Sequence, residues 1–267
     1  MNDNMHRSSE RRFMSRKVLA ITLALVAGAA VLPLGNSGVG AAVPCRSWAF
    51  IGIPGSGQGR AHNPGLSSDT ALYGPEVAKV KQAFVAKRGA TNVAVYPINY
   101  TAYNVAPNLL FGVAANLVAY NASVSRGVTE TKRIISNVAA ACPGTRFVIS
   151  GYSQGAQVAT NTLGSFPVAS SKLYRVGLMG NPRFSDGSVN SVEVPAGSIG
   201  RHGVFNGGAT WLSTWNGKVR DVCIDRDTFC EAGSAFNFDA HGAYNTRAYP
   251  GSITVISTYL GRTWLGG

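Results

Sequence analysis

The residues Gly151-Tyr152-Ser153-Gln154-Gly155 decide how this chain is interpreted. The apolar run Phe147–Ser150 predicts a buried strand before them, and Gly155–Leu163 predicts a helix after them. A strand that turns sharply into a helix leaves space only for small flanking residues, which explains the two glycines. Such a turn lifts the Ser153 side chain above the sheet, beside a helix N-terminus that favours developing negative charge. The stretch therefore predicts a serine nucleophile on a strand–turn–helix unit.

Strands and helices alternate on both sides of this unit. The predicted strands are Trp48–Ile53, Val93–Tyr96, Phe147–Ser150, Leu173–Met179 and Val219–Cys223. The predicted helices run from Pro75 to near Gly89, and over Ser123–Ala141, Gly155–Leu163 and Ile253–Leu260. Repeated alternation implies a parallel sheet covered on both faces. We expect one domain over residues 43–267, of the α/β-hydrolase type, with a mostly parallel sheet of about five strands flanked by helices.

Two segments interrupt the alternation, and we expect both to be loops over the face that carries Ser153. Thr101–Tyr120 is apolar and contains Leu109, Leu110 and Phe111. For these three residues ordinary packing and an exposed apolar patch with a function are equal alternatives. Ser185–Asn216 is rich in Gly and Ser and carries Trp211 and Trp215 near its end.

The N-terminus has the pattern of an export signal. Five basic residues precede the apolar run Val18–Leu34, and Gly40-Ala41-Ala42 supplies the small residues that a signal peptidase requires. We expect residues 1–42 to be a signal peptide and the protein to be secreted or associated with the cell envelope. An uncleaved anchor is the alternative, and the export route, Sec or Tat, stays open despite the Arg11-Arg12 pair.

The chain is basic, with a net charge of +12 that falls to +9 once the five basic and two acidic residues of the signal are removed. A positive chain favours anionic surfaces such as acidic envelope polymers or lipids. We prefer the interpretation of a solubilising charge scattered over the surface, because no dense Lys/Arg run and no nucleic-acid motif is present. The sequence therefore argues against a nucleic-acid partner, and we expect a monomer.

Four cysteines, Cys45, Cys142, Cys223 and Cys230, all follow the signal. In an exported protein they predict two disulfides, for which three pairings exist. Cys223 and Cys230 enclose only six residues, which favours a local bridge and leaves Cys45 to pair with Cys142. A metal site is not expected, because no Cys-x-x-Cys pair exists and the histidines are scattered.

A serine is a weak nucleophile and needs a base, together with a group that orients the base. This type of fold has the chain order serine, acid, histidine, and only His202 and His241 follow Ser153. With His202 as base, the available acids are Asp186 and Glu193. With His241 as base, they are Asp221, Asp225, Asp227, Glu231 and Asp239.

The loop between Cys223 and Cys230 directly follows a predicted strand, and a small disulfide loop is a rigid mount. This favours His241 as the base, with Asp225 or Asp227 as the acid. We interpret His62 and His202 as ordinary surface or loop histidines.

Three stretches carry a resemblance to a known family. They are Cys142-Pro143-Gly144-Thr145 leading into Gly151-Tyr152-Ser153-Gln154-Gly155-Ala156, then Cys223-Ile224-Asp225-Arg226-Asp227-Thr228-Phe229-Cys230, and His241-Gly242-Ala243-Tyr244. They resemble the cutinase family, in particular its actinobacterial cutinase-like members, over nearly all of the mature chain. The resemblance implies that the acid is the fourth residue after the first cysteine of the loop, which is Asp227 rather than Asp225. It also implies the bridges Cys45–Cys142 and Cys223–Cys230.

In the family a Ser or Thr after a Gly in the first strand's loop is an oxyanion-hole donor, and Gly55-Ser56 matches that position. We expect the oxyanion hole to consist of Ser56 and Gln154. The sequence departs from the family pattern at Arg226, where Gly is usual, and at Thr228, which replaces an apolar residue. The first loop reads Ile-Pro-Gly-Ser instead of Ala-Arg-Gly-Ser or Ala-Arg-Gly-Thr. These changes keep the Ser/Asp/His set intact and leave the substrate preference open.

The resemblance implies a serine esterase that hydrolyses carboxylic esters through an acyl-enzyme, without a metal or organic cofactor. Ser153 is the expected nucleophile, His241 the base and Asp227 the acid. The expected substrates are lipid-like or short-to-medium acyl esters, with polyesters as a further option. Acyl transfer, or an esterase specific for cell-envelope lipids such as mycolate esters, is one alternative. A non-catalytic envelope-binding protein on the same fold is another.

Overall fold

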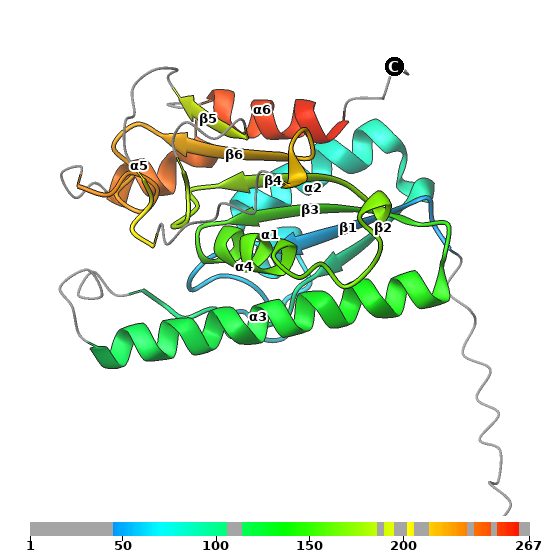
Figure 1. The fold of residues 1–267 in the computed structure, drawn as a ribbon, viewed down its shortest axis with the longest axis horizontal. Helices are drawn as coiled ribbons and strands as arrows, with labels where there is room; N and C mark the ends of the chain where they lie inside the picture. Colours follow the sequence, from blue (N-terminus) through cyan, green and yellow to red (C-terminus); the bar gives the residue numbers. More distant parts are fainter. Residues whose placement is uncertain are drawn as a thin grey trace, which may run out of the picture. The chain divides into compact units, whose positions relative to one another are not determined.

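The computed structural model describes residues 45–105, 114–185, 190–194, 202–205, 214–233, 238–246 and 250–261 (Figure 1). The expected signal peptide lies outside these residues, as do Leu109, Leu110, Phe111, Asp186 and Trp211. Val43–Gly267 forms one compact unit.

The unit is built on a parallel sheet of six strands in the order β2-β1-β3-β4-β6-β5. The strands are β1 Trp48–Ile53, β2 Val93–Pro97, β3 Arg146–Tyr152, β4 Leu173–Met179, β5 Ser191–Val194 and β6 Val219–Ile224. The five predicted strands are confirmed, and the parallel α/β class with them. The expected sheet of about five strands has six. The expectation that Ser185–Asn216 is a loop was wrong at Ser191–Val194, which forms the short edge strand β5.

The first four helices lie in the connections between strands, and the last two follow the last strand of the chain. They are α1 Asp69–Tyr73, α2 Pro75–Arg88, α3 Ala114–Ala141, α4 Gln154–Leu163, α5 Phe238–His241 and α6 Pro250–Gly261, with short 3₁₀ turns η1 Ala90–Asn92, η3 Ser170–Lys172 and η5 Gly242–Asn245. The prediction that Thr101–Tyr120 is a loop was wrong for its last residues, since α3 begins at Ala114 and not at Ser123. The buried Tyr120 explains the earlier start, because it extends the stripe of α3 that faces the core.

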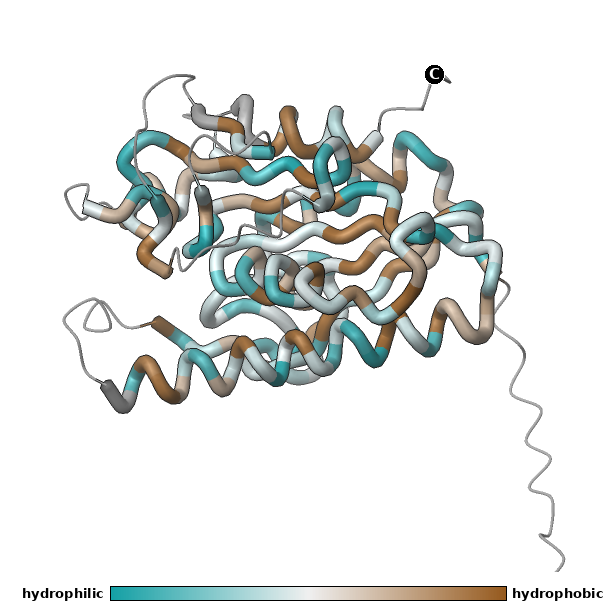
Figure 2. The backbone as a smooth tube through the Cα atoms, in the orientation of Figure 1, coloured by the Kyte–Doolittle hydropathy of each residue, from teal (hydrophilic) through white to brown (hydrophobic). Residues whose placement is uncertain are grey.

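Apolar side chains fill both faces of the sheet, and Figure 2 shows the apolar segments along its strands. On one face α3 and α4 pack through residues such as Val124, Ile135 and Val158. On the other face α2 and α6 pack through residues such as Val77, Phe84 and Ile256. The sheet is therefore covered on both sides and its inner strands are buried, whereas the edge strand β2 is partly exposed, with Val95 at 40%.

Both expected disulfides are present. Cys45–Cys142 lies beside the amino ends of β1 and β3, and Cys223–Cys230 links the last residues of β6 to the loop after it, at the carboxyl end of the sheet. Among the described helices, α3 included, none combines the length and apolar character that a membrane crossing requires.

Candidate active site

Ser153 occupies the turn between β3 and α4 with φ 53° and ψ −122°, a left-handed region that a non-glycine residue rarely adopts. The residues two positions before and two positions after Ser153 must be glycine. A Cβ atom at Gly151 would lie 2.5 Å from the carbonyl oxygen of Gly155, and one at Gly155 would overlap the carbonyl oxygen of Ile53. The Ser153 N–H donates to the Met179 carbonyl of β4 at 2.8 Å. This strained turn between β3 and α4, called the Ser153 elbow below, is thus anchored to the neighbouring strand.

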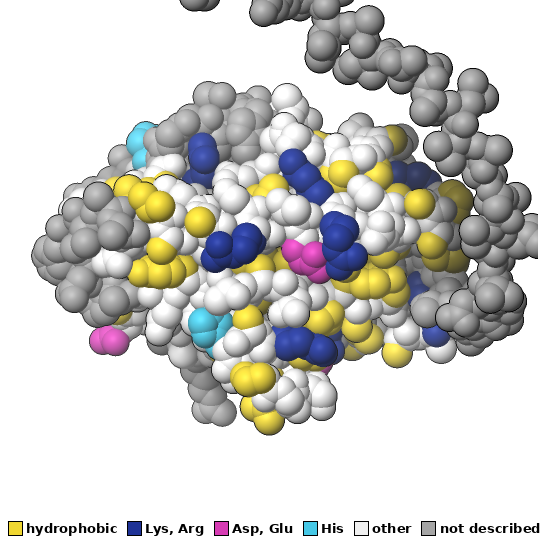
Figure 3. All heavy atoms as spheres, turned by 90° about the horizontal axis from the view of Figure 1, so that it is seen from below, with side chains coloured by type: hydrophobic (Ala, Val, Ile, Leu, Met, Phe, Trp, Pro, Cys, Tyr) yellow, Lys and Arg dark blue, Asp and Glu magenta, His cyan; other side chains and the backbone are white. Residues whose placement is uncertain are grey.

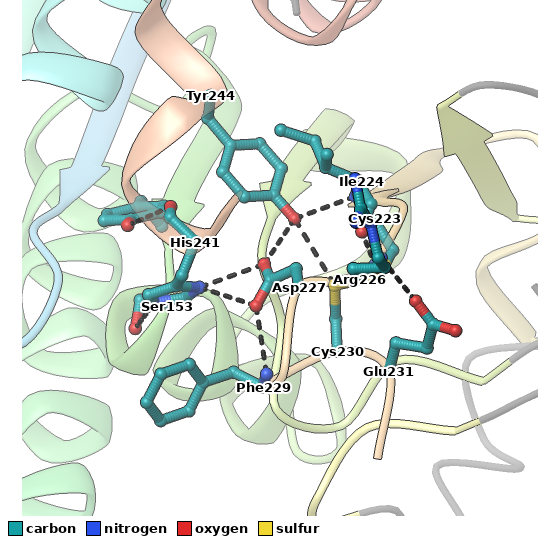
Figure 4. A network of polar contacts seen from close by, with 11 residues as sticks. Ser153, Cys223, Ile224, Arg226, Asp227, Phe229, Cys230, Glu231, His241 and Tyr244 are labelled. Carbon is teal, nitrogen blue, oxygen red and sulfur yellow. Dashed lines mark hydrogen bonds and ion pairs between the residues drawn. A yellow bond between two sulfur atoms is a disulfide. The ribbon is translucent and has the colours of Figure 1, made fainter. Parts of the chain in front are cut away.

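The structure brings Ser153, His241 and Asp227 together (Figure 4). The Nε2 atom of His241 lies 2.8 Å from the Ser153 hydroxyl, and its Nδ1 atom lies 2.9 Å from both carboxylate oxygens of Asp227. Because an ionised carboxylate only accepts hydrogen bonds, we assign the imidazole proton to Nδ1, which leaves Nε2 to accept from the serine. This geometry can move a proton from the serine hydroxyl to the imidazole.

The disulfide loop after β6 presents Asp227 inward and Asp225 outward. The Asp227 side chain is fully buried, and its N–H donates to the Ile224 carbonyl at 3.0 Å. Asp225 forms an ion pair with Arg226 at 3.6 Å in which the arginine side chain is mostly exposed. Arg226 has φ 61°, a conformation that favours glycine and accounts for the glycine that is usual there in the family.

Tyr244 is a site residue to which the sequence analysis gave no role. Its hydroxyl donates to Asp227 Oδ2 at 2.7 Å and accepts from the Ile224 N–H at 3.1 Å. The Phe229 N–H donates to Asp227 Oδ1 at 2.9 Å. Burial, with the neighbouring Asp227 carboxylate, raises the pKa of Tyr244 well above its usual value, so the phenol remains a donor. The spacing His241-x-x-Tyr244 could have indicated this role, because residues three positions apart lie on the same face of a helical turn.

Two aromatic rings enclose the imidazole of His241. The Tyr152 ring stacks on it at 5.1 Å between centroids, and the Phe229 ring lies 4.3 Å away. The Tyr152 hydroxyl also donates to the carbonyl oxygen of His241 at 2.7 Å. The side chain and the main chain of His241 are therefore both held by residues that adjoin the other two site residues.

The residues expected to form an oxyanion hole lie on two adjoining segments. Gln154 is the first residue of α4, where backbone N–H groups have no partner within the helix. Ser56 lies in the turn after β1 that the Gln58 N–H closes on the Gly55 carbonyl at 3.1 Å. A Cβ atom at Gly55 would lie 2.8 Å from the Tyr152 ring, so this turn lies directly against the Ser153 elbow.

The other histidines lie outside this cluster. His62 contacts the Ala102 carbonyl through Nε2 at 2.6 Å. His202 is exposed and forms an isolated bridge with Ser185. Among the described residues no three His, Cys, Asp or Glu side chains gather in a way that would hold a metal ion.

The expectation that the segment near Trp215 flanks the elbow was wrong for that residue. The Trp215 indole donates to the carbonyl of Leu163, the last residue of α4, at 3.2 Å. Ten residues of helix, about 15 Å, separate it from Ser153. The first turns of α3 lie nearer, because the Tyr120 hydroxyl donates to Gln157 Oε1 at 2.7 Å, in the first turn of α4. Leu117, one turn before Tyr120, is 40% exposed.

Charge on the face shown in Figure 3 is dispersed. Lys and Arg side chains are separated there by uncharged and apolar ones and form no continuous patch. This face fits a scattered solubilising charge better than a dedicated anionic-polymer surface.

Comparison with known proteins gives the family. The family model described as Cutinase matches residues 60–257. Carboxylesterase Culp1 of Mycobacterium tuberculosis is 27% identical over 232 residues, which cover 85% of each chain. A cutinase of Kineococcus radiotolerans is 34% identical over 140 residues, 49% of this chain and 44% of that protein. A cutinase-like protein from Cryptococcus sp. superposes with a TM-score of 0.60 at 20% identity over 83% of this chain and 98% of that chain, which supports the fold. The chain belongs to the cutinase family.

Proposed function

We propose that this protein is a secreted serine esterase that hydrolyses carboxylic esters through an acyl-enzyme on Ser153. Membership of the cutinase family and the carboxylesterase name of a relative support a carboxylic ester hydrolase. The observation that carries the proposal is the position of His241, with Nε2 2.8 Å from Ser153 Oγ and Nδ1 2.9 Å from the buried Asp227 carboxylate.

The mechanism follows from the order of these contacts. His241 takes the Ser153 proton as Ser153 Oγ attacks the ester carbonyl, and Asp227 stabilises the imidazolium. The backbone N–H groups of Gln154 and Ser56 stabilise the oxyanion, and each such donor contributes about 2.7–4 kcal/mol to lowering the barrier. The imidazolium then protonates the leaving alcohol. Water, deprotonated by the same imidazole, releases the acid and restores the serine.

Apolar surface beside the elbow supports an acyl group as the part of the substrate that is bound there. Leu117 on α3 and Phe238 on α5 are 40% and 39% exposed. Phe238 contacts Phe229, which in turn lies against His241. Large exposed apolar side chains near a reactive group commonly bind apolar ligands, so we propose lipid-like or short-to-medium acyl esters as substrates.

Secretion is part of the proposal. Two disulfides are typical of proteins that fold in an oxidising compartment, and the basic and apolar N-terminal pattern supports export.

Hydrolysis of p-nitrophenyl acetate and butyrate by the purified wild type and by Ser153→Ala tests the proposal. We expect the wild type to be active and Ser153→Ala to be reduced to background while its thermal unfolding remains cooperative. Ser165→Ala, an exposed serine after the far end of α4, is the matched control and keeps full activity. Activity of folded Ser153→Ala equal to that of the wild type would refute the mechanism.

A further inference from the structure

A second buried carboxylate, Glu76, lies at the carboxyl end of the sheet. Glu76 is in the first turn of α2 and is only 3% exposed, whereas acidic residues in a helix's first turn usually face water. Its Oε2 accepts from Gln58 Nε2 at 3.0 Å, and its Oε1 accepts from Asn245 Nδ2 at 2.9 Å. Each oxygen thus holds a different segment of the chain.

Gln58 connects Glu76 to the turn that carries Ser56. The Gly55 N–H donates to Gln58 Oε1 at 3.0 Å. Because a backbone N–H can only donate, this contact fixes the side-chain amide with its oxygen toward Gly55 and its nitrogen toward Glu76. The orientation of Gln58 and the position of the expected oxyanion-hole turn are therefore coupled.

Asn245 connects Glu76 to the segment that carries His241. Asn245 ends η5, four residues after His241, and its carbonyl accepts from Lys79 of α2 at 2.6 Å. The side chain and the carbonyl of Asn245 are thus both held by α2.

Burial of a carboxylate needs a reason beyond stability. Moving a carboxylate out of water is costly even when it is hydrogen-bonded, and apolar replacements of buried charges are often neutral or stabilising. Burial raises the pKa of Glu76 above its usual value, although the hydrogen bonds from Gln58 and Asn245 oppose this rise. The two amide donors are arranged for an acceptor at both oxygens, as a carboxylate provides.

We propose that Glu76 is a positioning residue that holds the Ser56 turn and the His241 segment in fixed relative positions, through Gln58 and Asn245. The inference rests on the proposed function, because it assigns these two segments to one catalytic site. Oxyanion donors and the base must both be held close to their working geometry, and a displacement of about 1 Å can cost on the order of 10²-fold in rate.

The test compares Glu76→Leu with the exchange variant Gln58→Glu/Glu76→Gln. In Glu76→Leu the apolar side chain offers no acceptor to Gln58 Nε2 or to Asn245 Nδ2, so both arms of the bridge open. The exchange restores every donor–acceptor pair: the new Glu accepts from the Gly55 N–H and from the new Gln, whose oxygen accepts from Asn245.

With p-nitrophenyl butyrate we expect Glu76→Leu to lower kcat by roughly ten- to a hundred-fold with little change in KM. The exchange variant should regain most of the loss. Glu130→Leu, the same substitution in an exposed ion pair with Arg133, should match the wild type. A wild-type kcat for Glu76→Leu, or an exchange variant as slow as Glu76→Leu, would overturn the proposal.

If Glu76→Leu does not fold, Asn245→Ala opens one arm without altering the charge. A comparable loss of kcat is then expected, and an unchanged kcat overturns the proposal. Ser153→Ala, assayed in parallel, distinguishes failure of the proposed function from failure of the role of Glu76. If folded Ser153→Ala keeps hydrolysing the ester, both the proposed function and the role of Glu76 fail. Ser153-dependent hydrolysis that Glu76→Leu does not affect refutes only the role of Glu76.

Discussion

At the amino ends of the strands, arginines lie over aromatic rings, whereas at the carboxyl ends buried carboxylates accept hydrogen bonds from several donors. The guanidinium groups of Arg88 and Arg146 lie 4.4 Å and 4.7 Å from the Trp48 ring. At the other end Tyr244 donates to Asp227, which is fully buried. Charged groups are therefore stabilised by aromatic rings at one end of the sheet and by hydrogen bonds at the other.

The difference follows from what each charge requires. A guanidinium over a ring gains from the ring quadrupole while its edges can remain hydrated, so its position need not be tightly fixed. A buried carboxylate needs donors at defined positions, and Asp227 has three, from His241, Phe229 and Tyr244. We infer that the amino end mainly stabilises the fold and that the carboxyl end is preorganised for chemistry.

The largest predicted effect is on activity at the carboxyl end. Asp227→Asn should lower kcat by on the order of 10⁴, because it disturbs the tautomer of His241 and removes the charge that stabilises the imidazolium. Asp225→Asn, in the same loop but in an exposed pair with Arg226, should remain within about twofold of the wild type. Steady-state hydrolysis of p-nitrophenyl butyrate measures both variants. If Asp225→Asn instead of Asp227→Asn lowers kcat by orders of magnitude, our assignment of the acid is wrong.

The two disulfides lie at opposite ends of the sheet. We expect removal of one to affect mainly the free energy of unfolding and removal of the other to affect mainly kcat. Cys45–Cys142 spans 97 residues and Cys223–Cys230 spans 7. Replacing the first pair by alanine should lower the free energy of unfolding by about 4–5 kcal/mol, as expected for a loop of this length. Replacing the second should cost less than about 3 kcal/mol, yet impair kcat more, because that bridge holds the mount of Asp227. Urea unfolding and ester hydrolysis under native conditions measure the two effects, and the reverse pattern would contradict the division between the ends.

Asp221 shows what happens to a buried carboxylate with fewer donors. Asn181 donates to its Oδ2 at 2.7 Å, and its Oδ1 has no hydrogen-bond partner among the described residues. Burial raises the pKa of Asp221 from its usual 3.8 to about 7. The folded protein therefore holds a proton that the unfolded chain releases, and stability falls as pH rises from about 4 to about 7.

Asp221→Asn removes this dependence. Relative to the wild type, the variant should gain on the order of a few kcal/mol in unfolding free energy between pH 4 and pH 8. Urea unfolding at several pH values across this range measures the gain. A difference between the two proteins that does not vary with pH would show that Asp221 does not titrate in this window.

The smallest predicted effect concerns acyl length. Leu117→Ser should lower kcat/KM for octanoyl esters by roughly fivefold, about 1 kcal/mol, because the chain loses apolar contact. Acetyl esters should change little. Val118→Ser, at the next and more exposed position of α3, is the control and should leave both substrates unaffected. Equal losses for short and long esters in Leu117→Ser would place the acyl groove elsewhere.

The sequence predicted those parts of the structure that depend on the residues of one short segment alone. The buried strands are apolar runs bounded by turns, and the elbow needs small residues at fixed positions, so both were found. The edge strand β5 was missed because four residues, Ser191–Val194, give too short a pattern. The acid was narrowed to Asp225 or Asp227 from the residues, and the choice of Asp227 came from the family resemblance.

Contacts between distant segments could not be predicted from the sequence where no cysteine pair or catalytic motif marks them. Glu76 and Asn245 are 169 positions apart, and Glu76 after Pro75 looks like an ordinary acidic residue in a helix's first turn. Trp215 was misplaced because its segment is not periodic, so nothing in the sequence indicated at which end of α4 it would pack.

In the proposed mechanism Ser153 is a nucleophile that His241 activates. The most direct measurement is intact-protein and peptide mass spectrometry after treatment with a fluorophosphonate. We predict one covalent adduct per chain, located on Ser153, with no adduct on Ser153→Ala and much slower labelling of His241→Ala. An adduct on another residue, or no adduct on folded wild-type protein, would contradict the account.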